Sequence, residues 1–140
     1  MEHSNPRTQI REGIEAALGG IAKVWHYRMM PFNMDEIPSI NILPETDSEL
    51  ETSLRNNNWR ETETFRVELA IARETDEERF ADRVDALYLQ VKRALLKMKT
   101  CVKCPKVHIQ RRMWAVDDRG QVPLVVIRFF VSVEFDADET

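Results

Sequence analysis

The stretch TFRVELAI, residues 64–71, decides the fold class because its side chains alternate between apolar and mostly polar types. Phe65, Val67, Leu69 and Ile71 fall on one side of an extended chain, and the residues between them fall on the other. This alternation is typical of an antiparallel strand that has one face against the core and one face in water. We therefore predict a half-buried antiparallel strand here.

The C-terminal run LVVIRFFVSVEF, residues 124–135, repeats this pattern over a greater length. Every second residue from Val125 to Phe135 is apolar. The other side of this strand is mixed, because it carries Val126 and Phe130 among polar residues. We expect something to cover part of that second face.

A hairpin is predicted before this last strand. Val107, Ile109 and Met113 lie on a preceding strand, and the residues DDRGQ around Gly120 provide a turn. Two further strands are predicted nearer the N-terminus. One contains Ile40 and Ile42, and a short one spans residues 25–29.

The longest helix is predicted between the two strand regions. The segment Thr75–Glu78 fits a capping box, in which the Thr hydroxyl accepts from the third backbone amide and the Glu side chain reaches back. Apolar residues then recur at helical spacing over five or six turns. They are Phe80, Val84, Leu87, Tyr88, Val91, Leu95 and Met98.

An N-terminal helix is also predicted. Asn5 is suited to the N-cap and Pro6 to the first helical position. An apolar stripe follows from Ile10 to Ile21, and Gly19-Gly20 marks the expected end. The order helix, strands, helix, strands predicts an α+β fold in one domain over residues 1–140, with a mainly antiparallel sheet and both helices on one face.

Composition narrows the class of protein. The chain has 140 residues with 43% hydrophobic and 31% charged side chains, which is ordinary for a globular domain. Its net charge of −4 gives it no general attraction for phosphate or anionic lipid. We see no apolar run long enough for a membrane span and no secretory signal at the start. These features predict a cytoplasmic protein that does not enter the membrane.

Residues 44–58 are expected to form a long polar loop between two strands. The segment holds four acids and three consecutive asparagines, and it has no apolar stripe. Loops above about 12–15 residues are uncommon in compact domains and are usually functional or disordered. We expect this segment to serve in an interaction.

Cys101-Val-Lys-Cys104 is the motif with the most obvious chemical potential. A redox dithiol favours the start of a helix, whereas this pair follows one, where the helix dipole disfavours a thiolate. A structural zinc ion needs four ligands, and only His108 is near in sequence. A redox or metal protein remains the less favoured alternative, and an incidental connector is the preferred interpretation.

No catalytic signature is present. The sequence has no GxSxG, HExxH, P-loop or GxGxxG motif, and its three histidines occur in unrelated contexts. We expect a protein that is not an enzyme and that uses no cofactor and no metal.

Charge is distributed unevenly along the chain. Residues 92–112 contain eight cations and no acid, while acids gather in the 44–58 loop and after residue 133. Helix-dipole compensation explains part of this pattern. The alternatives are a contact with a charged partner or a second copy, and a weaker one is a nucleic-acid patch. The candidate partner-interface residues are Glu45, Asp47, Glu49, Glu51, Arg55, Lys92, Lys99, Lys103, Lys106, Arg111, Arg112 and Phe130.

The order of segments resembles the lambda-type phage tail terminator family, the proteins similar to minor tail protein U. The resemblance lies in the P-x-h-x-h strand at Pro38–Ile42, the acidic loop after it, and the strand that opens at Trp59-Arg60-Glu61-Thr62 and continues through Phe65–Leu69. The long helix and the final strand Leu124–Phe135 complete a match over residues 7–136. The cysteine pair and the dense basic stretch depart from the family pattern.

This resemblance implies a phage or prophage tail assembly protein. Members form hexameric rings that cap the growing tail tube and join it to the head connector. The implied partners are copies of the chain itself, the tail tube protein and the head–tail connector protein, with DNA passing through the ring. The implied locations are the host cytoplasm during assembly and the virion tail. Another head–tail connector, or a self-associating cytoplasmic α+β module, is the alternative.

Overall fold

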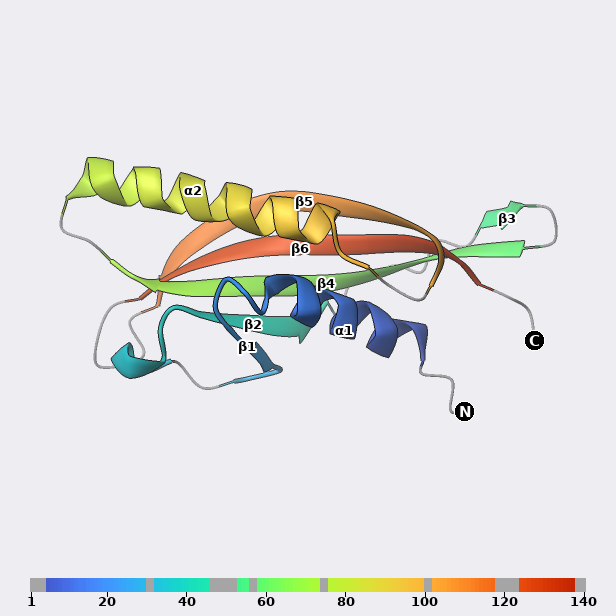
Figure 1. Cartoon of the computed structure of the whole chain (residues 1–140), viewed down its shortest axis with the longest axis horizontal. Helices are drawn as coiled ribbons and strands as arrows, with labels where there is room; N and C mark the ends of the chain where they lie inside the picture. The colour runs from blue at the N-terminus through green and yellow to red at the C-terminus, as the bar shows by residue number, and fades with distance from the viewer. Residues whose placement is uncertain are drawn as a thin grey trace.

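A computed structural model of the chain describes residues 5–29, 32–45, 53–55, 58–73, 76–99, 102–117 and 124–137 (Figure 1). Two α-helices, a short 3-10 helix and six strands make up these residues. In chain order they are α1 (Pro6–Leu18), β1 (Lys23–His26), η1 (Met34–Glu36), β2 (Ser39–Pro44), β3 (Ser53–Arg55), β4 (Asn58–Ala72), α2 (Glu77–Leu96), β5 (Lys103–Asp117) and β6 (Leu124–Ala137).

The strands form one sheet in the order β1-β2-β4-β6-β5, with β3 paired to the beginning of β4. All pairs are antiparallel except β1 with β2, which are parallel. The two predicted hairpin strands pair from Lys103 opposite Asp136 to Asp117 opposite Leu124. The α+β prediction with a mainly antiparallel sheet is confirmed.

The alternating residues build the core as the sequence predicts. Register places Ile42 of β2 opposite Val67 of β4, and Val67 opposite Phe129 of β6, so these three side chains form one row across the sheet. All three are fully buried. Because one residue of slippage would move each row to the other face, this core fixes the register.

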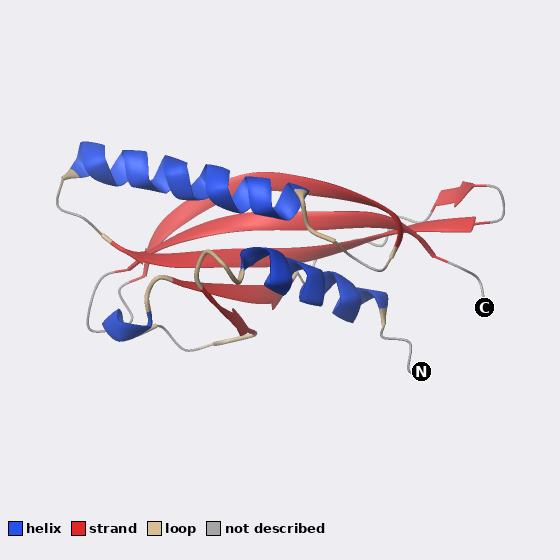
Figure 2. Cartoon of the chain, in the orientation of Figure 1, coloured by secondary structure: helices blue, strands red, loops and turns tan. Residues whose placement is uncertain are grey.

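Both helices cover the same face of the sheet, as expected, with α1 toward β2 and α2 toward β5 (Figure 2). From α1, Ile10, Ile14 and Leu18 enter the core, and from α2 the residues Val84, Val91 and Leu95 do so. The ring of Tyr88 also stacks on Phe129 at 5.5 Å between centroids. Neither described helix is both long and apolar enough to cross a membrane.

The helix ends agree with the sequence in one case and differ in the other. Asn5 caps α1, since its side-chain oxygen accepts from the Arg7 amide at 2.8 Å. The N-cap of α2 is Asp76 rather than Thr75, which lies outside the described residues. The Asp76 carboxylate accepts from two backbone amides at 3.1 Å each. A carboxylate is favoured here because it also meets the positive end of the helix dipole.

The prediction of an uninterrupted loop over residues 44–58 is wrong at three places. Pro44 is the last residue of β2, and Asn58 is the first of β4. Ser53–Arg55 form β3, which pairs antiparallel with the start of β4. In Figure 1 this β3 end of the sheet projects past the ends of both helices. Residues 46–52 and 56–57 lie outside the described part of the chain.

The strand expected at residues 25–29 lies earlier, at Lys23–His26. It ends because Tyr27 adopts a positive φ of 54°, a conformation that is uncommon for residues other than glycine. The Tyr27 amide still bonds to the Ile42 carbonyl at 2.9 Å. This turn directs the chain onto the face of the sheet that the two helices leave uncovered.

Candidate interaction surfaces

The outer face of the sheet is the side directed away from α1 and α2. Its described side chains on β4, β5 and β6 are the ones that alternate with the core residues. They are Thr62, Thr64, Arg66, Glu68, Lys106, His108, Gln110, Val126, Arg128, Phe130, Ser132 and Glu134. This face therefore combines both charges, hydroxyl groups and a few apolar side chains.

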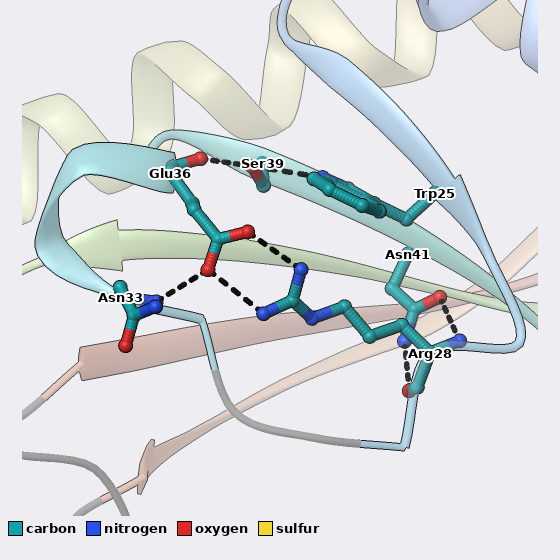
Figure 3. Close-up of polar contacts among 6 residues, drawn as sticks. All are labelled: Trp25, Arg28, Asn33, Glu36, Ser39 and Asn41. Atoms are coloured by element: carbon teal, nitrogen blue, oxygen red, sulfur yellow. Dashed lines mark hydrogen bonds and ion pairs between the residues drawn. The ribbon is translucent and has the colours of Figure 1, made fainter.

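At the β1–β2 side the chain covers its own outer face with described residues of 27–29 and 32–38 (Figure 3). Arg28 and Asn41 hold this segment on β2 through two hydrogen bonds. The Arg28 amide donates to Asn41 Oδ1 at 3.1 Å, and Asn41 Nδ2 donates to the Arg28 carbonyl at 2.7 Å. Asn41 is only 6% exposed, so this reciprocal pairing satisfies an amide that would otherwise be costly to bury.

The Arg28 guanidinium contacts two aromatic rings and one carboxylate. It lies 4.6 Å from the Trp25 ring centroid and 4.5 Å from that of Phe32. Its two terminal nitrogens donate to the Glu36 carboxylate at 2.6 and 2.8 Å, a bidentate geometry. This set of residues is a fixed cover over β2.

Glu36 completes this cover through a second donor. The hydrogen bond from Arg28 and then the one from the Asn33 amide, at 2.9 Å, hold the pKa of the Glu36 carboxyl below its ordinary value. The Glu36 carbonyl accepts from the Ser39 hydroxyl, which also accepts from Trp25 Nε1 at 3.3 Å. Sequence reasoning missed this cluster. The polar Ser39 and Asn41 within an apolar strand pattern were the available signal.

The rest of the outer face, across β4, β6 and β5, carries two pairs of side chains that contact each other between β4 and β6. Arg128 Nε donates to Glu68 Oε2 at 2.7 Å. The Thr64 and Ser132 hydroxyl groups are 2.9 Å apart. Such pre-arranged side chains lose little conformational freedom when a second surface contacts them.

Phe130 is half-buried among these pairs, and in register it lies beside Arg66 and Gln110. In the adjacent rows His108 Nε2 is 3.0 Å from Glu134 Oε2. In the described part of the chain, α1 and α2 pack on the opposite face of the sheet, and β3 pairs with β4. Phe130 is the candidate interface residue that the structure places at the centre of the outer face.

The basic run of residues 92–112 does not form one surface. Lys92 is on α2, its ammonium 6.0 Å from the centroid of the Tyr88 ring, on the helix-covered side. Lys106 lies on the outer face opposite Glu134, and Lys103 lies opposite Asp136. The backbone at the start of β5 therefore pairs with the part of β6 that carries Glu134 and Asp136, and the basic residues of this run lie on both sides of the sheet.

The remaining candidates are spread over the molecule. Lys99 is exposed after α2, and the Glu45 amide donates to the Thr64 carbonyl at 3.4 Å. Arg55 belongs to β3, and Arg111 and Arg112 lie in the irregular part of β5 between Gln110 and Met113. Asp47, Glu49 and Glu51 lie outside the described residues.

The cysteine motif is placed in part. Cys104 belongs to β5 rather than to a connector, and Cys101 lies outside the described residues. Across the described stretches of the chain, no three His, Cys, Asp or Glu side chains gather in a way that could hold a metal ion.

A scan against protein-family models finds no match, and a search among curated proteins finds no similar sequence.

Proposed function

We propose that this chain is a structural assembly protein of the tail terminator type. Its copies form a ring, hexameric by the resemblance, that caps a tail tube and joins it to the head connector. The order α1, short strands, β4, α2 and a final hairpin supports the proposal, because it follows the segment order on which the resemblance rests. The proposed role is contact between proteins and involves no catalysis.

The observation that carries the proposal is the part of the outer face around Phe130, which neither described α-helix covers. Protein–protein contacts commonly place an aromatic residue at the centre and polar groups at the rim. Here the half-buried Phe130 lies between Arg66 and Gln110, and the ion pair of Arg128 with Glu68 occupies the adjacent row. This face carries positive and negative side chains, and Arg128 is already paired with Glu68. Such a face suits a protein partner better than a polyanion.

A ring needs contacts between two different surfaces of the same chain. The sheet offers this asymmetry, because one edge is the short parallel strand β1 and the other is the long strand β5. We propose that the outer face near β5 meets a different surface of the next copy. The tail tube protein then binds one rim of the ring, and the head connector protein binds the other.

The direct test places a negative charge at the centre of the proposed contact. Phe130→Asp should convert ring-sized particles to monomers in light scattering, with an unchanged circular dichroism spectrum. Ala16→Asp is the matched control, since Ala16 is exposed on α1 on the helix-covered side and receives the same charge. Rings that persist in Phe130→Asp would contradict the proposed contact surface.

A second arm of the test adds a purified tail tube protein. The proposal expects the wild-type chain to bind the end of a tube and to stop its growth. A wild-type chain that forms rings and ignores tubes would instead favour the connector alternative. A chain that stays monomeric with and without tubes would contradict the proposed function.

A further inference from the structure

The side of α2 that faces away from the sheet carries an apolar stripe. Leu89 is 47% exposed and Leu96 is 55% exposed, which makes them two of the few large exposed hydrophobic residues in the described chain. They are seven positions apart, with the exposed Arg93 between them and the exposed Ala86 three positions before Leu89, all at helical spacing. In Figure 1 no element is drawn over this outward side of α2. Single exposed leucines are common, whereas two on one stripe are a candidate contact.

The same stripe is polarised along its length. Its N-terminal half carries the exposed acids Glu78, Asp82 and Asp85, with the exposed Arg79 on its flank, and the cations Arg93, Lys97 and Lys99 lie near and just beyond its C-terminal end. Compensation of the helix dipole explains charges in the first and last turns, but it does not reach Asp82 and Asp85 or the leucines. A stripe that is acidic at one end and basic at the other is complementary to its own reverse.

We propose that α2 pairs antiparallel with α2 of a second copy of this chain, about a two-fold axis near Leu89. An axis at this residue places Leu89 against the partner's Leu89, while Leu96, seven positions after it, lies opposite the partner's Asp82. Asp85, four positions before the axis, then faces the partner's Arg93, four positions after it. The contact occurs twice, once on each side of the axis, as an isologous interface requires.

This inference does not rest on the proposed ring, because it uses a different surface and a different symmetry. In a free chain the contact gives a dimer, and in rings it pairs two rings face to face. A 20-residue helix is about 30 Å long, so the contact is small and the dimer is weak. A membrane surface fits less well, since the acidic half of the stripe would be repelled by anionic lipid.

The decisive experiment is a charge swap measured by sedimentation velocity at protein concentrations up to about 1 mM. Asp85→Arg alone and Arg93→Asp alone should each weaken dimerisation by about tenfold or more, because each places like charges opposite each other twice. The double variant Asp85→Arg/Arg93→Asp should return to near the wild-type association. In a parallel pair residue 85 would face residue 85 of the partner, so each single variant would only exchange one pair of like charges for another and would not weaken association.

A cross-linking experiment tests the position of the axis. In a Cys101→Ser/Cys104→Ser background, Leu89→Cys should form a disulfide dimer under mild oxidation, and Gln90→Cys, exposed on the flank of the helix, should not. Thermal melts of every variant verify that the fold is retained. A wild-type chain that stays monomeric, a double variant as weak as the single ones, or equal cross-linking at residues 89 and 90 would overturn the proposal.

Discussion

Arg28 and Glu36 form a two-pronged ion pair, with nitrogen–oxygen distances of 2.6 and 2.8 Å, over the outer face of β2. The two residues are only eight positions apart in sequence, and their pairing covers the buried polar side chains Ser39 and Asn41. The aromatic rings of Trp25 and Phe32 hold the guanidinium between them. This cover separates the outer face into a part that the chain closes itself and a part, around Phe130, that no described helix covers.

The first prediction concerns the pH dependence of this ion pair. Because the pKa of Glu36 is lowered from 4.5 in the folded chain, the ionised form stabilises the fold above that value, and the stabilisation is lost as the pH falls through the lowered pKa. Glu36→Gln should therefore melt below the wild type at about pH 6, and the difference should shrink by about pH 3. Asp35→Asn is the control, since Asp35 is an exposed neighbour. A melting difference that is constant over this range would contradict the role given to Glu36.

The second prediction compares two adjacent leucines of α2. Leu95 is fully buried in the core, and Leu96 is 55% exposed. Leu95→Ala should lower the free energy of unfolding by about 2–5 kcal/mol, the usual cost of a cavity. Leu96→Ala should change it by about 0.5 kcal/mol or less in dilute protein. Urea denaturation measures both, and similar costs for the two would mean that α2 is rotated relative to the sheet.

The third prediction concerns the cap of α2. Asp76→Ala should destabilise the fold by about 0.5–2 kcal/mol, because two backbone amides lose their acceptor. Asp82→Ala, which removes an exposed carboxylate within the same helix, serves as control and should be nearly neutral. Chemical denaturation gives both values. An Asp76→Ala chain as stable as the wild type would indicate that Thr75 caps the helix after all.

The fourth prediction concerns β3. Replacing residues 46–57 by a short Gly/Ser linker removes β3, whose contacts are with the first residues of β4. The core begins farther along β4, at Phe65, and loop-closure entropy changes only with the logarithm of loop length. The melting temperature should therefore stay within a few degrees, while tail assembly should fail. Normal tails from this variant would make the segment a passive connector.

Local patterns predicted most of the fold. The alternation at residues 64–71 and 124–135 identified two adjacent strands, since a period of two determines which face of the sheet is buried. The cap at Asn5 followed from the side-chain chemistry of that residue. In both cases the deciding interactions are made between residues close in sequence or within one strand.

Features that depend on tertiary contacts were not predicted. The cover over β2 requires Arg28 to reach Asn41 on another strand, and no periodicity reports that contact. The basic run is continuous in sequence, but a helix and a strand place Lys92 and Lys106 on opposite sides of the sheet. β3 was missed because residues 53–55 lie in a mostly polar segment and form a strand only by pairing with β4.

We propose that copies of this chain assemble into rings through the outer face around Phe130. Native mass spectrometry of the wild type and of Phe130→Asp, alone and mixed with a tail tube protein, measures the size of these assemblies. We expect a closed ring of one defined stoichiometry for the wild type, hexameric by the resemblance, and monomers for Phe130→Asp. A wild-type chain that remains monomeric in both settings, or a Phe130→Asp chain that forms the same ring, would contradict it.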